Sequence, residues 1–323
     1  MRPLLRPFVA VASVTLTVGL AAAPASAVPT TTLDPAKLPR GADVAIPHLD
    51  KKTIVDGSVR IRVKAPRVTL LGKSGTGYVV GTSDRDGSHG RIHRYEADGS
   101  STQLVRAQSY ASVLSGDGQT LLSVKGRSKS VVSARSATTG ALVAQRTFKG
   151  YVDVVDAEGS RVLLSSWEEG TQQWDTGSDA VTPVSKRVAG SGDLSADVFS
   201  SYSKDPYEGG CTIVSPISRP AKRLWTSCKE RVEAFSADGA RMATVDILSD
   251  GLGPTYVAAR KVTGKKLGAY LVRDGWFGAI RFETSTALLL DTFGLDESAT
   301  VRCTGSDCER ASDLRPTQTP RIS

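Results

Sequence analysis

A turn motif that recurs about every 41 residues is the feature that most constrains how this chain folds. Its glycine, or the residue that takes its place, returns after steps of 41, 41, 39 and 41 residues. The positions are Gly77, Gly118, Gly159, the segment Ala196-Asp197-Val198, and Gly239. Glycine accepts the positive φ angle that a tight reversal between two strands requires. A fixed period of this length predicts repeated units that each contribute one small sheet.

The unit from Tyr110 to Lys149 shows what each repeat contains. Four short β-rich runs are separated by a turn at residues 115–118, a basic loop at residues 125–129 and a Thr-Thr-Gly turn at residues 138–140. Such runs between glycine turns are typical of antiparallel hairpins. A single four-stranded sheet has two apolar faces, so neighbouring copies must stack against it to cover them.

A second turn repeats in the same register and begins one unit earlier. Its upstream copy, Val55-Asp56-Gly57-Ser58, precedes Gly99 by 42 residues. A degenerate first turn, Glu283-Thr284-Ser285, brings the count to six first turns and seven second turns. A period near 40 with four strands per unit is that of a β-propeller blade. We therefore predict an all-β propeller with six complete four-stranded antiparallel blades and an N-terminal hairpin that forms a partial seventh. The alternative is a six-bladed ring with this hairpin packed outside it.

The turn sequence Ser-x-Asp-Gly, present at residues 115–118 and 236–239, resembles that of WD-repeat-like and TolB-like propellers of secreted bacterial proteins. The resemblance covers roughly residues 45–314 and implies the fold, with the propeller domain expected at residues 46–314. The chain departs from the eukaryotic WD repeat, because only Trp174-Asp175 forms a Trp-Asp pair and no unit has a Gly-His pair. A β-sandwich would also contain short alternating strands, but it gives no reason for a 41-residue period.

The N-terminus has the pattern of a secretory signal peptide. Arg2 and Arg6 precede an apolar run from Phe8 to Ala23 and the small residues Ala25-Ser26-Ala27. This pattern predicts cleavage after Ala27, and hence a secreted protein that meets the membrane only through a transient signal peptide. The rival, an uncleaved anchor, needs an apolar run of about 20 residues. Residues 28–45 lack hydrophobic periodicity and are expected to form a disordered linker, and residues 315–323 a C-terminal tail.

The charge balance is mildly basic. Loss of residues 1–27 removes two of the 41 basic residues, and the remaining 39 basic and 33 acidic residues give a formal charge of +6. This surplus favours anionic envelope polymers or lipid headgroups, or it only keeps the protein soluble. No nucleic-acid-binding motif occurs in the sequence, so we expect no nucleic-acid partner.

The four cysteines of the predicted mature chain can pair in three ways. An even number in an exported protein predicts disulfides. In the repeat register, Cys211 and Cys228 lie across one hairpin, and Cys303 and Cys308 flank the turn of another. We expect these two local pairs to act as structural bonds, because no Cys-x-x-Cys redox motif is present.

The two ends of the predicted ring differ. One end carries the tight glycine turns, and the other carries longer, dissimilar loops, where recognition usually resides. Four residues that enter innermost strands near the channel mouth at this varied end are candidate ligand-binding residues, able to stack on a sugar ring or clamp an extended peptide. The alternative is that the aromatic members only fill space between blades. The four candidates are Tyr110, Tyr151, Arg231 and Trp276.

The sequence lacks the usual signatures of catalysis. It has no Gly-x-Ser-x-Gly motif, and His89 and His93 would lie about 13 Å apart on an extended strand. We assign no catalytic residue, metal ligand or cofactor. The hypothesis is an exported, monomeric, non-catalytic propeller that binds an unknown protein or an anionic cell-envelope polymer. The alternative is a propeller hydrolase or lyase acting on carbohydrate or lactone, with carboxylates contributed by separate blades.

Overall fold

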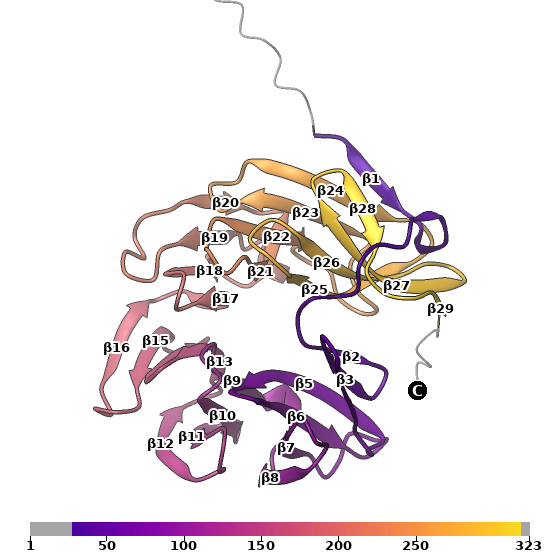
Figure 1. Cartoon of the computed structure of the whole chain (residues 1–323). Helices are drawn as coiled ribbons and strands as arrows, with labels where there is room; N and C mark the ends of the chain where they lie inside the picture. Colours follow the sequence, from indigo (N-terminus) through magenta and orange to yellow (C-terminus); the bar gives the residue numbers. More distant parts are fainter. Residues whose placement is uncertain (1–27, 318–323) are drawn as a thin grey trace, which may run out of the picture.

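Seven antiparallel sheets surround a central axis in the computed structural model, which describes residues 28–317 (Figure 1). Six of them have four consecutive strands, and we number these blades 1 to 6 in chain order. Blade 1 contains β5 (Arg67–Ser74), β6 (Gly77–Ser83), β7 (Arg91–Tyr95) and β8 (Ser101–Val105). Blade 2 contains β9 (Ser112–Leu114), β10 (Thr120–Lys125), β11 (Lys129–Ser136) and β12 (Leu142–Lys149). Blade 3 contains β13 (Asp153–Glu158), β14 (Arg161–Ser166), β15 (Gly170–Asp175) and β16 (Val181–Ser185).

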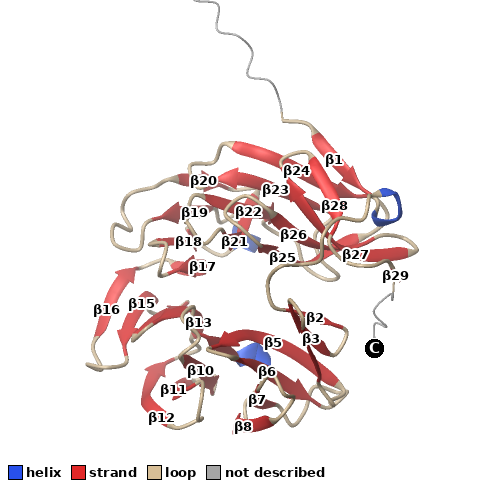
Figure 2. Cartoon of the chain, in the orientation of Figure 1, coloured by secondary structure: helices blue, strands red, loops and turns tan. Residues whose placement is uncertain are grey.

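The second half of the ring repeats this arrangement. Blade 4 contains β17 (Val188–Asp193), β18 (Val198–Tyr202), β19 (Thr212–Ser215) and β20 (Trp225–Ser227). Blade 5 contains β21 (Glu230–Phe235), β22 (Arg241–Asp246), β23 (Tyr256–Lys261) and β24 (Lys266–Val272). Blade 6 contains β25 (Trp276–Phe282), β26 (Leu288–Phe293), β27 (Glu297–Thr304) and β28 (Asp307–Arg310). Within residues 28–317, helix is limited to the short 3-10 turns η1 (Pro35–Lys37), η2 (Ser109–Ala111) and η3 (Pro206–Glu208), as Figure 2 shows.

Blade 7 comes from the N-terminal part of the chain and closes the ring. It contains β2 (His48–Asp50), β3 (Thr53–Asp56) and β4 (Val59–Arg62), and β2 lies next to β5 of blade 1. The prediction of a seven-bladed ring with a partial N-terminal blade is confirmed. The blade has three strands because β2 adds to the predicted hairpin.

The Ser-x-Asp-Gly turns are held by side-chain hydrogen bonds. The Ser115 hydroxyl donates to Asp117 Oδ1 at 2.5 Å, and the same oxygen accepts from the backbone N–H of Gln119 at 3.1 Å. Gly118 has a φ of +70°, and a Cβ there would lie 2.4 Å from the carbonyl oxygen of Lys73 in the preceding blade. Glycine is therefore needed both for the reversal and for the close approach of two blades.

Apolar side chains fill the spaces between successive blades. Trp174 of blade 3, for example, is fully buried and packs edge-on against Phe148 of blade 2, with ring centroids 6.0 Å apart. Similar buried clusters join each blade to the next from blade 7 through blade 6. Within residues 28–317 no such cluster joins blade 6 to blade 7, so the ring must close there by other contacts.

A strap formed by residues 34–47 makes that closure, which corrects the expectation of a disordered linker at residues 28–45. The preceding strand β1 (Thr30–Leu33) pairs in parallel with β24 on the outside of blade 5. The strap then crosses blade 6, where Val44 is buried against Leu289. A segment without hydrophobic periodicity is thus ordered by backbone pairing, polar contacts and single buried apolar residues, which periodicity does not report.

Arg302 of blade 6 fixes the strap. Its guanidinium donates to the carbonyl oxygens of Ala42 at 3.0 Å and Asp43 at 2.9 Å. It also pairs with the buried carboxylate of Glu283, which accepts from the backbone N–H of Ala45 at 2.7 Å. The pair therefore anchors both sides of one stretch of the strap to blade 6.

The C-terminal part of the chain also pairs at this seam. Strand β29 (Arg315–Pro316) pairs with β27, and Arg315 forms an ion pair with Asp50 of blade 7. Pairing thus continues into the segment expected to be a tail, of which residues 318–323 lie outside the described part. The predicted signal peptide, residues 1–27, lies outside it as well. In residues 28–317 no helix is long and apolar enough to cross a membrane.

Both predicted disulfides are confirmed. Cys211 bonds to Cys228, beside the first residue pair of the β19–β20 ladder. Cys303 bonds to Cys308, which lies directly opposite it in the β27–β28 ladder. Each bond therefore crosses a single hairpin, as the repeat register predicts.

We predict that Arg302→Met lowers the free energy of unfolding by about 3–5 kcal/mol, because it leaves the Glu283 carboxylate buried without its cation. Glu283 is 4% exposed in its side chain. Denaturant unfolding measures the change. Combining Arg302→Met with Glu283→Gln removes the unpaired charge and should recover part of the loss; a double variant as unstable as the single one would contradict this account.

Asp156 links blades 3 and 4 at the end that carries the tight turns. Its carboxylate accepts a hydrogen bond of 2.6 Å from the backbone N–H of Leu194. Burial, which disfavours the charged form, raises the pKa of Asp156 to about 6. The folded state therefore holds the proton more tightly than the unfolded state does. The protonated carboxyl of Asp156 therefore stabilises the folded state below about pH 4, and this contribution is lost as the pH rises toward 6.

We predict that Asp156→Asn increases the free energy of unfolding at pH 7.5 by about 1–2 kcal/mol. One pKa unit corresponds to about 1.4 kcal/mol, and partial exposure of the side chain reduces the full effect. The amide oxygen can still accept from Leu194. At pH 4 the variant and the parent should unfold at the same denaturant concentration, and a gain of equal size at both pH values would argue against the titration of Asp156 as its source.

Candidate functional site

The end of the ring opposite the tight turns is the candidate binding surface, and we call it the varied face. It consists of the connections between blades and of the loops between the second and third strands of each blade. These loops are residues 84–90, 126–128, 167–169, 203–211, 247–255 and 294–296. Their lengths and sequences differ, whereas the turns at the opposite end repeat.

Exposed apolar side chains are concentrated on the varied face. Among the described residues, nine large hydrophobic side chains are exposed, and seven of them belong to its loops and connections. The remaining two lie on β12, the outermost strand of blade 2. The seven are Tyr110, Tyr151, Trp167, Tyr207, Leu248, Leu252 and Leu295. Apolar groups gathered on one face of a soluble fold indicate an interaction surface.

The four candidate residues predicted from the sequence separate into two groups. Tyr110 in η2 is 88% exposed and Tyr151 is 54% exposed, and both line one cavity at blades 1, 2 and 3. The lining of this cavity does not include Arg231 or Trp276.

Arg231 and Trp276 make internal contacts instead. Arg231 pairs with Glu233 and donates to the carbonyl oxygen of Ser249 at 3.0 Å, which anchors the 247–255 loop. Trp276 is half-buried and stacks on Phe293, with ring centroids 5.1 Å apart and planes 7° apart. Their contacts fit the alternative, in which such residues fill space and support loops.

The cavity that contains the two tyrosines is cationic, and we call it the cationic groove. It has a volume of about 650 Å³ and is lined by a single carboxylate, that of Asp153. Four basic side chains line it, and none of them has a carboxylate oxygen within 4.0 Å among the described residues. The four are Arg106, Lys125, Arg127 and Arg135. Only the basic loop at residues 125–129 is visible in the sequence, because the groove depends on strand register.

Strand alternation gives the two faces of blade 2 different neighbours. Val132 and Ala134 of β11 pack in the cluster shared with blade 3. Ser133 and Arg135, on the other face of the same strand, line the groove. Ser133 accepts a hydrogen bond of 2.8 Å from Nε2 of Gln145, so the floor between the charged residues is neutral and polar. Successive residues of a strand point to opposite faces, which produces this division.

Two groups in the groove have unusual electrostatic surroundings. Asp153 beside the Tyr151 hydroxyl raises the pKa of that phenol, while the cation of Arg127 acts in the opposite direction. Arg135 donates through Nη1 to the carbonyl oxygen of Gly140 at 3.0 Å. Its Nε is buried and has no hydrogen-bond partner among the described residues. A buried donor without a partner is a position where a ligand oxygen would be stabilising.

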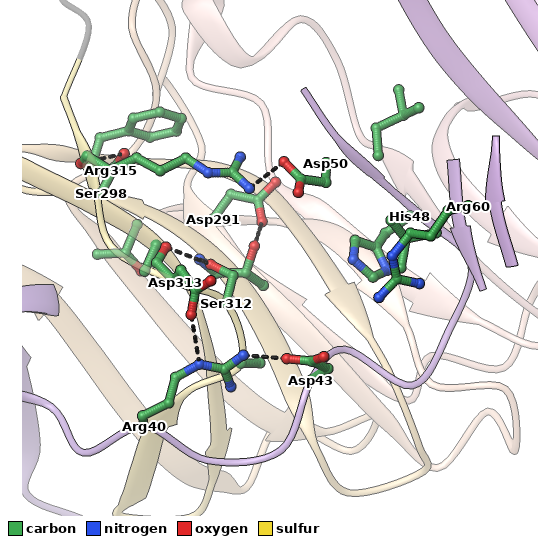
Figure 3. Close-up of a pocket in the computed structure, with 17 residues that line it drawn as sticks. Arg40, Asp43, His48, Asp50, Arg60, Asp291, Ser298, Ser312, Asp313 and Arg315 are labelled. Carbon is green, nitrogen blue, oxygen red and sulfur yellow. Dashed lines mark hydrogen bonds and ion pairs between the residues drawn. The ribbon is translucent and has the colours of Figure 1, made fainter. Parts of the chain in front are cut away.

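A second cavity lies at the seam between blades 6 and 7 (Figure 3). It has a volume of about 260 Å³, and several of its charged side chains pair with one another. Arg40 of the strap lies between the carboxylates of Asp43 and Asp313, and Arg315 points to Asp50 (Figure 3). These paired charges hold the ring closed, so the cationic groove is the better candidate for a binding site.

The fold is similar to that of many solved structures at low sequence identity. One chain in a crystal structure of the mitotic checkpoint complex is 13% identical, with a TM-score of 0.54 over 86% of this chain and 89% of that chain. The β-propeller domain of Myceliophteria thermophila Cps50 (Swd1) is 10% identical, with a TM-score of 0.51 over 78% and 90%. A prolyl endopeptidase is 11% identical, with a TM-score of 0.52 over 78% of this chain and 43% of that chain.

At these identities the comparisons show the fold alone. No family model matches the chain, and the search of curated proteins found no match. The likeness to WD-repeat propellers is therefore confirmed at the level of the fold. The closer resemblance to TolB-like propellers of secreted bacterial proteins remains a prediction from the sequence.

Proposed function

We propose that this chain is an exported, non-catalytic β-propeller that binds a partner protein or a cell-envelope polymer through its varied face. The observation that carries the proposal is the one-sided distribution of exposed apolar side chains. Seven of the nine in the described chain lie on the loops and connections of that face. Loops on a rigid repeated scaffold are where binding residues are usually found.

The chemical character of these side chains supports a binding role. Tyr and Trp are the residues that most often dominate interface energetics, since they bury a large area and can still hydrogen-bond. Trp167 is 60% exposed, and Leu295 on the opposite side of the ring is 74% exposed. Such residues favour contact with a large ligand that spans several blades over a small molecule held in one pocket.

The proposed extracellular location agrees with the covalent structure. Both disulfides cross single hairpins, and such bonds persist in oxidising compartments. The predicted signal peptide would provide the export route. The basic surplus of the mature chain would favour anionic components of the envelope as a setting for binding.

We predict that Trp167→Ser combined with Leu295→Ser lowers binding to cell-envelope fractions of the source organism at least tenfold. The reason is the loss of two exposed apolar anchors from the varied face. Co-sedimentation of the purified protein with those fractions measures the change.

The matched control is Leu142→Ser combined with Val143→Ser, which removes two exposed apolar side chains from β12. This control should sediment like the parent protein, and both double variants should keep the parent melting temperature because the replaced side chains are exposed. Equal loss of binding in the two variants would show that the varied face is not the recognition surface.

A further inference from the structure

We infer that the cationic groove binds an acidic, extended peptide segment. The inference rests on the proposed function, because it names the part of a partner protein that would enter one region of the varied face. The groove is distinct from the exposed apolar side chains of blades 4 to 6, so the two parts can be tested separately.

The charge of the side chains that line the cationic groove is unbalanced. Four basic side chains and a single carboxylate line the groove, and the four cations lack carboxylate partners among residues 28–317. Other arginines of the ring do have a carboxylate partner, among them Arg40 and Arg315 at the seam. Mutual repulsion of unpaired cations is relieved when an anionic ligand is bound, and a positive cleft attracts such a ligand over a distance.

The basic side chains are spread along the length of the groove. Lys125 is paired with Val131 at the varied-face end of the β10–β11 ladder, and Arg135 is paired with Leu121. The two positions on β10, Leu121 and Lys125, are four residues apart along the strand. This separation is about 13 Å at about 3.3 Å per residue. One small anion cannot contact both ends. An extended peptide of about four or five residues can do so, with about 3.3 Å per residue.

Neutral polar side chains lie between the basic residues of the groove. Ser123 and Ser133 are opposite one another in the ladder and line the groove together with Gln145. Hydroxyl and amide groups can pair with the backbone N–H and C=O groups of a peptide. These neutral groups therefore favour a peptide over an anionic polysaccharide, whose backbone has no amide groups.

The two ends of the groove differ in their side chains. At the mouth, Tyr110 and Tyr151 offer apolar ring faces beside the exposed cation of Arg127. Deeper, the half-buried Arg135 lines the groove, and its buried Nε has no hydrogen-bond partner among residues 28–317. Arginine suits this role because its planar donors match a carboxylate in two-point contact.

The test measures binding of labelled glutamate peptides to the purified full-length protein by fluorescence anisotropy. An acetylated hexaglutamate should bind, and its affinity should fall as salt is raised from 50 to 300 mM. Lys125→Gln combined with Arg127→Gln should weaken binding at least tenfold. Lys222→Gln combined with Arg223→Gln makes the same charge change on an exposed loop of blade 4, and this control should leave binding within twofold of the parent.

A second variant tests the length of the site. Arg135→Gln should weaken hexaglutamate binding at least fivefold and leave the weaker binding of diglutamate unchanged, because a dipeptide reaches only the mouth. A purely structural effect of Arg135 would lower both affinities together, and the melting temperature identifies a variant that is unfolded.

Two results would overturn the inference. One is hexaglutamate binding that is equal in the Lys125/Arg127 variant and in its control. The other is binding of an oligogalacturonate of similar length with no binding of hexaglutamate, which would assign the groove to an anionic polysaccharide. If either of these results is found while the Trp167/Leu295 variant still loses binding to envelope fractions, the proposed function stands and this inference alone fails.

Discussion

The ion pair between Arg302 and Glu283 fixes the strap that helps to close the ring. Six junctions between blades are sealed by apolar side chains, and the seventh, between blades 6 and 7, has no such cluster among the described residues. There the strap is bound to blade 6 through backbone groups that contact this pair. Blade 7 follows directly from the strap, so its position beside blade 6 depends on a polar anchor, whereas an apolar cluster packs it against blade 1. A buried pair with further hydrogen bonds can provide this because its geometry is directional.

Close packing of the blades at the end with the tight turns explains why the loops of the opposite end are freer to vary. At the end with the tight turns, blades approach so closely that a Cβ at Gly118 would lie 2.4 Å from the Lys73 carbonyl oxygen, and Asp156 bonds to the backbone of the next blade. Substitutions there disturb a neighbouring blade as well as their own. The loops of the opposite end are longer and more exposed, so they can change in sequence and length at little cost to the ring. A binding surface built on those loops therefore places little constraint on stability.

The repeated part of the fold could be predicted from the sequence because its signal is local. Glycine turns such as Gly118 and Gly239 recur at a fixed period, and the same register placed the cysteine pairs correctly. The strap and β1 could not be predicted, because their partners in blades 5 and 6 are more than 200 residues away and their sequences carry no periodicity. The groove was missed for a similar reason. Arg135 and Lys125 read as separate solvated charges until the register places both along one cavity.

In the proposed function, the cationic groove and the exposed apolar side chains of the varied face would contribute to binding in different ways. Unpaired cations at the groove act over a Debye length of about 8 Å at physiological salt, so they would govern how fast an acidic partner is captured. Apolar side chains such as Trp167 and Leu295 act only on contact, so they would govern how slowly the partner leaves. Each region alone would bind weakly. Because both belong to one rigid ring, a partner held at the groove meets the apolar loops at a high effective concentration, and the combined affinity exceeds that of either region.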